Sequence, residues 1–195
     1  MKQVIGITGN SGSGKTRASK IISTITNGLV IDADQVVKKL SKPNEEYFNA
    51  IRNVFGEEYF LEDGNLNRKL LAKEIYENKE SLEKLNGLTF KYVVQEIKKE
   101  IDEADCNIII VDAPLLFESG LDKCCTKIIV LVAPLEIKVR RIMERDNLSE
   151  EIALSRIKIQ TKEEEYKRNA DIVIENIVDE ELEEKIKDAL NKLKI

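Results

Sequence analysis

The chain has 195 residues, of which 42% are hydrophobic and 34% charged, the balance of a single globular domain with a sizeable core. Its formal net charge of −5 argues against a nucleic-acid-binding surface, and the lack of an apolar run of about 18 residues argues against a membrane span. Because the chain contains no histidine, Ser-His and His-metal mechanisms are excluded, and any proton transfer falls to carboxylates, lysine or tyrosine.

The first predicted strand, residues 4–8, runs into a glycine-rich loop with the phosphate-loop pattern G-x-x-x-x-G-K-[ST]. A helix-compatible stretch, residues 17–25, follows. In this context the glycines let backbone N–H groups approach an anion closely, and the helix N-terminus adds partial positive charge. We expect Lys15 to reach the β- and γ-phosphates of ATP and the Thr16 hydroxyl to ligate Mg²⁺. The predicted ATP-binding residues of the loop are Asn10, Ser11, Gly12, Ser13, Gly14, Lys15 and Thr16.

The second predicted strand, residues 28–32, ends in Asp32-Ala33-Asp34. Ligands of open α/β sheets bind at the carboxyl ends of the strands, so both aspartates fall where a substrate is expected. Asp34 is the first candidate to accept a proton from an acceptor hydroxyl, and Asp32 is the second. Either carboxylate is also suited to orienting Mg²⁺ through water or to capping the helix that follows.

About 75 residues separate the second strand from the third, and they read as helices at about 33–40, 44–54, 67–76 and 79–103. A single crossover between parallel strands needs only one helix. We therefore expect a helical insertion over about 41–104 beside a core formed by about 1–40, 105–134 and 170–195.

The third predicted strand, residues 107–112, is a β-branched run that ends at Asp112. An acidic residue at this position commonly holds Mg²⁺ or its water shell in phosphate-loop enzymes. The apolar loop after it, residues 114–118, is predicted to contact the acceptor through Leu115, Phe117 and Glu118, or alternatively to belong to the core.

A fourth strand is predicted at 127–132, a charged helical stretch at 135–169, a fifth strand at 171–174 and a closing amphipathic helix at 179–193. Arg141 and Arg145 are four residues apart in the charged stretch and share one helix face, with a hinge expected near 146–147. Arginines on a mobile lid suit bidentate contact with a phosphate and exclusion of water. The alternative is a solvated face with local ion pairs.

The chain has three cysteines, Cys106, Cys124 and Cys125, in no zinc-site spacing. Reduced thiols in a cytoplasmic protein are the expected state. The N-terminus passes directly into the first strand, so we expect no secretory signal peptide.

These residues together resemble the dephospho-coenzyme A kinase family over nearly the whole chain. The matching segments are Ile5-Gly6-Ile7-Thr8-Gly9, Ile31-Asp32-Ala33-Asp34, Gly64-Asn65-Leu66-Asn67-Arg68, Val111-Asp112-Ala113-Pro114-Leu115-Leu116-Phe117-Glu118, Arg141-Ile142-Met143-Glu144-Arg145-Asp146, Ser149-Glu150-Glu151, Ala153, Arg156, Gln160, Ala170-Asp171 and Asn176.

The resemblance implies an ATP-dependent kinase that phosphorylates the ribose 3′-hydroxyl of dephospho-coenzyme A, with Mg²⁺ and two small-molecule substrates, and with no nucleic-acid or membrane partner. It implies a three-layer phosphate-loop NTPase fold of the α/β class, with a mostly parallel five-stranded sheet, a helical acceptor-binding insertion and a helical lid. On this mapping Asp34 is the catalytic base and Asn176 lies near the ATP adenine. Arg141 and Arg145 lie near the phosphates, and Arg68 lies on the acceptor side.

The sequence departs from the family pattern at two places. Asn10 stands where the family usually has glycine, and Thr89-Phe90-Lys91 stands where it commonly has Thr-His-Pro, which affects acceptor affinity more than reaction class. Another phosphate-loop kinase, acting on a small metabolite or a nucleoside monophosphate, is the main alternative. A GTP-binding switch would need an Asn-Lys-x-Asp segment after a late strand, where the chain has Leu131-Val132-Ala133-Pro134.

Overall fold

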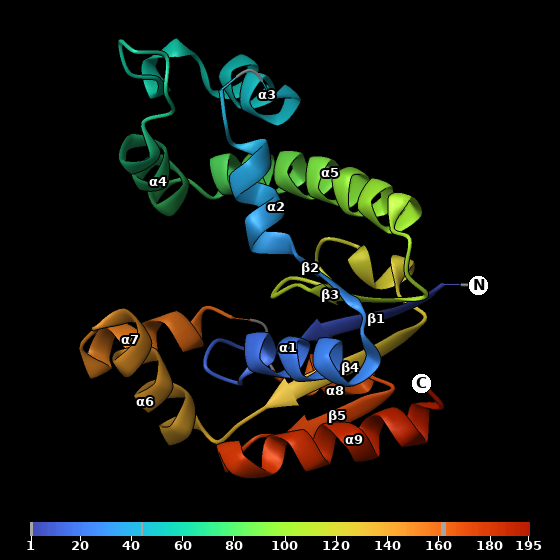
Figure 1. Ribbon diagram of the computed structural model, residues 1–195. Helices are drawn as coiled ribbons and strands as arrows, with labels where there is room; N and C mark the ends of the chain where they lie inside the picture. The colour runs from blue at the N-terminus through green and yellow to red at the C-terminus, as the bar shows by residue number, and fades with distance from the viewer. Residues whose placement is uncertain (1, 44, 161–162) are drawn as a thin grey trace. The chain divides into compact units, whose positions relative to one another are not determined.

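The computed structural model describes residues 2–43, 45–160 and 163–195 (Figure 1). The chain divides into two compact units. The first contains Met1–Asp32 and Glu103–Ile195, and the second contains Ala33–Asp102. Across the described ranges, no helix combines the length and the apolar character needed to cross a membrane.

The first unit is built on a parallel sheet of five strands in the part of the chain that is described, in the order β2-β3-β1-β4-β5. The strands are β1 (Gln3–Thr8), β2 (Leu29–Asp32), β3 (Ile108–Asp112), β4 (Lys127–Val132) and β5 (Ile172–Glu175). All five predicted strands are confirmed, with ends that shift by at most one residue. Asp112 is the register partner of both Ile7 and Asp32, so the carboxyl ends of the three strands are level with one another.

Helices cover both faces of this sheet. Helices α1 (Lys15–Thr26) and α9 (Leu182–Leu193) pack on one face, where Ile22 and Ile186 join the core, and α8 (Glu163–Arg168) packs on the other. The alternation along β4 serves both layers, because Leu131 belongs to the first core and Val130 to the second. The three-layer α/β prediction is therefore confirmed.

The charged stretch predicted at 135–169 forms three separate helices, α6 (Leu135–Asp146), α7 (Glu150–Lys158) and α8. Helix α6 ends at Asp146, and the residue after it, Asn147, has a left-handed conformation (φ 51°) that asparagine tolerates. Helix α7 begins after Ser149, whose side chain accepts a hydrogen bond from the Ile152 N–H. The predicted hinge near 146–147 thus coincides with a helix end, and residues 161–162 of the predicted stretch lie outside the described residues.

Two further predictions shift at their ends. The closing helix, predicted from residue 179, starts as the 3-10 turn η3 (Asp179–Glu181) before α9. A further 3-10 turn, η2 (Leu121–Cys124), precedes β4 and was not predicted. Helix α1 begins at Lys15 rather than at Arg17, because Gly14 supplies the left-handed residue from which the helix starts.

The second unit is helical. It contains α2 (Ala33–Leu40), α3 (Glu46–Phe55), the turn η1 (Glu57–Tyr59), α4 (Arg68–Glu77) and α5 (Lys79–Glu103), whose last residue is assigned to the first unit. The predicted helices are confirmed within two residues, and Asn44, where one was expected to begin, lies outside the described residues. The Tyr47 and Thr89 hydroxyls are 2.7 Å apart, and the Arg52 guanidinium lies 4.4 Å from the Phe60 ring centroid.

Truncation of Ile22 tests the core between α1 and the sheet. Ile22 is fully buried, whereas Ile25 on the same helix is 41% exposed. We expect Ile22→Ala to lower the free energy of unfolding by about 2–5 kcal/mol, because it leaves a cavity as well as losing buried area. Ile25→Ala is the matched control and should cost less than about 1 kcal/mol in urea denaturation. Equal losses for the two variants would contradict the assigned helix face.

Cys125 offers a second test of packing. Its Sγ atom would lie 2.8 Å from a Cβ atom added at Gly6, and burial raises the pKa of its thiol to about 12. Since the folded-state pKa exceeds the ordinary value of 9.0, the thiolate fraction at pH 8 is lower in the folded than in the unfolded chain. We expect iodoacetamide at pH 8 to leave Cys125 unmodified in the native protein and to modify it in denaturant, as peptide mass spectrometry would show. Rapid native modification would contradict this packing.

Candidate active site

The loop between β1 and α1 can be formed only by glycine at three positions. Gly9, Gly12 and Gly14 have φ angles of 141°, 80° and 99°, which side chains of L-residues rarely adopt. Space is also lacking, because an added Cβ would lie 2.1 Å from a carbonyl oxygen of β4 at Gly9 and 2.6 Å from one of α6 at Gly12. At Gly14 it would lie 2.2 Å from Asn176 Nδ2. The glycines therefore allow neighbouring segments to pack directly against the loop.

The interior of the loop is suited to an anion. Lys15 opens α1, and its ammonium group donates to the Asn10 carbonyl oxygen at 3.2 Å, so the charge lies beside the loop backbone. Within the described residues, Asn10 Oδ1 and Ser13 Oγ are buried side-chain atoms without a hydrogen-bond partner. Buried polar atoms of this kind are uncommon, and of the two the Ser13 hydroxyl is able to donate to a bound anion. The helix N-terminus and the ammonium group both favour negative charge there.

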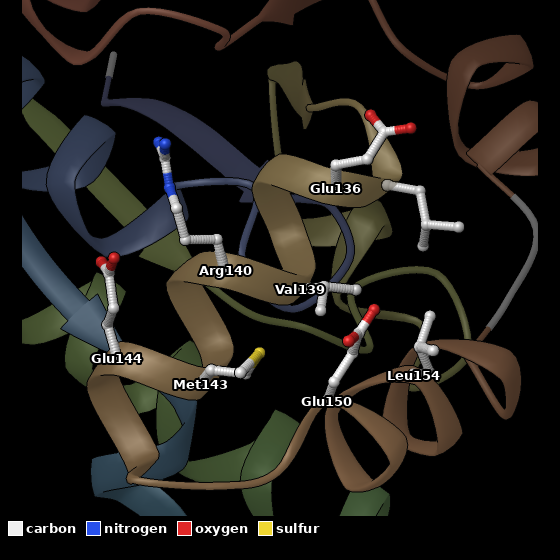
Figure 2. Close-up of a pocket in the computed structure, with 8 residues that line it drawn as sticks. Glu136, Val139, Arg140, Met143, Glu144, Glu150 and Leu154 are labelled. Atoms are coloured by element: carbon white, nitrogen blue, oxygen red, sulfur yellow. The ribbon is translucent and has the colours of Figure 1, made fainter.

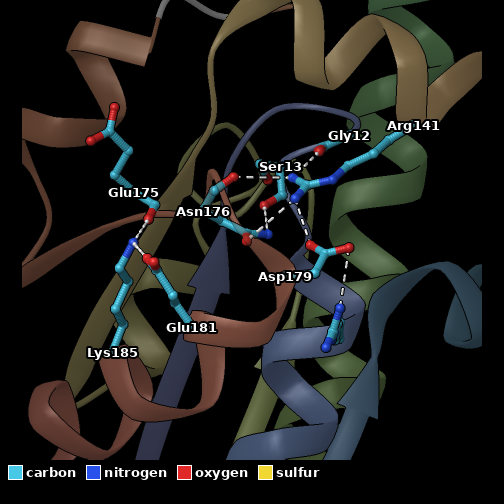
Figure 3. Close-up of polar contacts among 9 residues, drawn as sticks. Gly12, Ser13, Arg141, Glu175, Asn176, Asp179, Glu181 and Lys185 are labelled. Atoms are coloured by element: carbon cyan, nitrogen blue, oxygen red, sulfur yellow. Dashed lines mark hydrogen bonds and ion pairs between the residues drawn. The ribbon is translucent and has the colours of Figure 1, made fainter.

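The outer side of the loop is held by polar side chains from distant segments (Figure 3). Asn176, which follows β5 and is 1% exposed, donates through Nδ2 to the Ser13 carbonyl oxygen at 2.9 Å. Arg141 on α6 donates to the Gly12 carbonyl oxygen and to the Asn176 carbonyl oxygen, both at 3.2 Å. It also pairs with Asp179 at 2.5 Å. The carbonyl groups of Gly12 and Ser13 are thus satisfied from outside the loop.

Two carboxylates lie at the carboxyl edge of the sheet. Asp32 ends β2 and Asp112 ends β3, and they are register partners on neighbouring strands, which are about 4.8 Å apart. Asp112 is also the partner of Ile7, one residue before the end of β1, which leads into the phosphate loop. The acidic edge therefore belongs to the same end of the sheet as the loop.

This donor set fits Mg²⁺ bound with a nucleotide. Among residues 2–43, 45–160 and 163–195, no group of three histidine, cysteine, aspartate or glutamate side chains forms a metal site by itself. Mg²⁺ usually keeps several waters and takes one or two protein ligands together with substrate phosphates. The Thr16 hydroxyl on the first turn of α1 and the Asp112 carboxylate are groups of the required kind.

Comparison with known proteins decides the family. A family model described as dephospho-CoA kinase matches residues 3–182. The chain belongs to the dephospho-CoA kinase family. It is 40% identical over 173 residues to the dephospho-CoA kinase of Fusobacterium nucleatum, covering 89% of each chain. It is 39% identical over 197 residues to that of Listeria monocytogenes, covering 100% of this chain and 97% of the other. It is similar to the solved dephospho-CoA kinase from Campylobacter jejuni, with a TM-score of 0.67 and 25% identity over 99% of this chain and 98% of that one.

The two lid arginines named from the sequence lie in different surroundings. Arg141 is bound to the phosphate loop, as described above, and its side chain is 16% exposed. Arg145 is more exposed and donates to Asp146 through Nε and Nη2 at 2.8 and 2.9 Å, while Arg156 donates to the same carboxylate at 2.7 Å. The hydrogen bonds from Arg145 in particular hold the pKa of Asp146 below its ordinary value. In this member of the dephospho-CoA kinase family, one carboxylate therefore pairs with two arginines that a phosphate group would also attract.

Helices α6 and α7, which carry these arginines, border a groove of about 390 Å³ (Figure 2). Apolar side chains from α6 and α7 line much of it, among them Val139, Met143 and Leu154. Arg140 and Glu144 stand on the α6 side of this groove. It lies on the stretch predicted to be a lid, and its lining includes none of the residues predicted to bind a substrate.

The 114–118 loop is partly core and partly surface. Leu116 is fully buried, whereas Leu115 is 45% exposed. Phe117 stacks on the Tyr166 ring at 5.7 Å, and the Tyr166 hydroxyl donates to Glu118 at 3.0 Å and to the Pro114 carbonyl oxygen at 3.3 Å. Helix α8 thus determines the shape of this loop.

Asp34 and Arg68, the remaining predicted residues, belong to the second unit. Asp34 lies in the first turn of α2, where its charge is favourable to the helix dipole. Arg68 is the first residue of α4, after the N-cap Asn67, whose side chain accepts from the Leu70 N–H at 3.1 Å. Asp32 still belongs to β2, so the two aspartates of Asp32-Ala33-Asp34 come from a strand and from a helix.

Three residues of the site were not predicted from the sequence. Asp179 pairs with Arg141, Tyr166 holds the 114–118 loop, and Gln160 Oε1 accepts a hydrogen bond from the Ser11 N–H at 2.9 Å. No local signal marks Asp179 or Tyr166, because each lies in a run of charged residues. Gln160 belongs to the family pattern, but its position in the sequence does not show that it contacts the phosphate loop.

Replacement of Gly14 by alanine tests the loop geometry. The new Cβ would meet Asn176 Nδ2 in a conformation that alanine rarely adopts, so we expect Gly14→Ala to weaken MgATP binding at least about tenfold in calorimetry. Gly87→Ala is the control, because Gly87 lies within α5 and a Cβ there meets nothing within 4 Å. Gly87→Ala should bind MgATP normally and be stabilised by about 0.5–1 kcal/mol. Unchanged binding by Gly14→Ala would contradict the loop geometry.

Proposed function

We propose that this chain transfers the γ-phosphoryl group of ATP to the ribose 3′-hydroxyl of dephospho-CoA, giving CoA and ADP. The observation that carries the proposal is a phosphate loop that only glycine can form, with Lys15 at the start of α1, in a chain whose family match spans residues 3–182. The family match favours dephospho-CoA as acceptor over the metabolites and nucleoside monophosphates of other phosphate-loop kinases. We assign the activity to the cytoplasm, in keeping with three cysteines that form no disulfide.

In the ATP half of the site, the loop amides from Asn10 to Thr16 and the Lys15 ammonium hold the triphosphate. Phosphoryl transfer depends mainly on positioning and on neutralising charge, and these groups do both. Mg²⁺, held by Thr16 and by Asp112 or its water shell, would neutralise charge on the phosphate oxygens. Asn176 contributes by holding the loop, since its side-chain amide is bound to the Ser13 carbonyl oxygen.

In the acceptor half, we assign Asp34 as the base that takes the proton from the 3′-hydroxyl, with Asp32 beside it in the chain. Arg68 and the 114–118 loop, through Leu115, Phe117 and Glu118, would bind the acceptor together with the helical insertion at about 41–104. The exposed position of Leu115 and the support of Phe117 by Tyr166 are in keeping with this role. The lid at about 135–169 would bring Arg141 and Arg145 to the phosphates and exclude water.

Lys15→Ala tests the phosphate site. It removes a charge aimed at the transferring group, so we expect kcat/KM for CoA formation to fall by about 10²–10³-fold with the fold intact. Lys20→Ala on the exposed side of the same helix is the control and should remain within about twofold of the wild type. An unchanged rate for Lys15→Ala would exclude the site.

Asp34→Asn tests the base. If Asp34 accepts the proton, kcat should fall by about 10²–10⁴-fold while circular dichroism stays unchanged. Asp32→Asn is the comparison, and the larger loss in kcat identifies the base. A loss below about tenfold in Asp34→Asn would reduce Asp34 to helix stabilisation or metal orientation.

A further inference from the structure

Asp179 connects two helices through a single carboxylate. It is the first residue of η3, between β5 and α9. Its Oδ1 atom lies 2.5 Å from Arg141 Nη2 on α6 (Figure 3). Its Oδ2 atom lies 3.2 Å from Arg17 Nη1 on α1. Two cations therefore meet one anion at the outer side of the phosphate loop.

Asp179 supplies the charged acceptor in the contacts of Arg141. The other acceptors of this guanidinium are the Gly12 carbonyl oxygen at 3.2 Å, the Asn176 carbonyl oxygen at 3.2 Å and Asn176 Oδ1 at 3.4 Å. A hydrogen bond between two ionised groups is shorter and stronger than one to a neutral carbonyl group. The guanidinium is planar, so fixing one edge against Asp179 also fixes the direction of its remaining N–H groups.

The contacts of Arg141 and Asn176 determine how the loop amides point. Asn176 Nδ2 donates to the Ser13 carbonyl oxygen at 2.9 Å, and Arg141 in turn donates to Asn176. In a planar trans peptide the C=O and N–H bonds point in opposite directions. A hydrogen bond that draws the Ser13 carbonyl group outward therefore turns the Gly14 N–H inward, toward the side where an anion binds.

We propose that Asp179 is a positioning residue for the nucleotide, which holds Arg141 and, through Arg141 and Asn176, sets the orientation of the phosphate-loop amides. This inference rests on the proposed function, because it assigns the loop to ATP. It gives a role in ATP binding to a carboxylate that touches neither the loop backbone nor a substrate phosphate. Asp179 is negatively charged, yet it aids the binding of the anionic nucleotide because it acts through the guanidinium group of Arg141.

The chain offers a matched control in the same turn. Glu181, two residues after Asp179, is also a partly exposed carboxylate, and it pairs with Lys185 at 3.1 Å (Figure 3). Lys185 lies on α9 and donates to the Glu175 carbonyl oxygen, so this second pair joins η3 to α9 and β5. Comparing Asp179→Ala with Glu181→Ala therefore separates contact with Arg141 from the general loss of a surface ion pair.

The first experiment measures both Michaelis constants. We expect Asp179→Ala to raise KM for ATP about tenfold and to leave KM for dephospho-CoA within about twofold of the wild type. Asp179→Asn keeps an acceptor and loses the charge, so its KM for ATP should lie between the two. Glu181→Ala should match the wild type. Equal KM values for Asp179→Ala and Glu181→Ala, or an equal rise in both constants, would overturn the proposal.

The second experiment tests whether Asp179 acts through Arg141. In a double-mutant cycle, Asp179→Ala should raise KM for ATP about tenfold in the wild type and less than about twofold in Arg141→Ala. An equal rise in both backgrounds would overturn the proposal. The same cycle is read from MgADP affinity by calorimetry, which needs no turnover. A wild type that binds MgADP but forms no CoA would therefore refute the proposed acceptor and still test Asp179.

Discussion

The structure depends on one constrained stretch of backbone, the loop that joins β1 to α1. Three glycines adopt positive φ angles there, and each lies so close to a neighbouring segment that a Cβ atom would collide with it. The inward side of such a loop presents N–H groups, and its outward carbonyl groups need donors of their own. Asn176 and Arg141 supply these donors. The anion site is therefore made by segments that meet around the loop as much as by the loop itself.

The parallel register of the sheet brings the acidic residues to the same edge. Because Asp112 is level with both Ile7 and Asp32, the ends of β1, β2 and β3 coincide. Strands β3 and β4 are almost continuously buried and consist mainly of branched apolar residues, so their sequences alone indicated strands. Asp146, which pairs with Arg145 and Arg156 at the end of α6, is a second carboxylate that binds two arginines.

Much of the fold could be predicted because its signals are local. Apolar runs marked the five strands, and the phosphate-loop pattern located its own site. The sequence predicted a hinge near 146–147, where α6 ends, but it did not predict that residues 135–169 divide into α6, α7 and α8. Residues such as Asp179 and Tyr166 could not be identified, since their partners lie far away in the sequence and their neighbours are equally charged.

The sequence alone determined the class of fold, the position of the phosphate loop and the family resemblance, because each depends on residue types at short spacings. Only the tertiary structure decided what the outer side of that loop contacts. The side chain of Asn176, expected near the adenine, is bound to the Ser13 carbonyl oxygen, and Arg141 is bound to Gly12 and Asp179. These contacts follow from packing α6 and the β5–α9 connection against the loop, and hydrogen bonds between such distant segments leave no periodic trace in the chain.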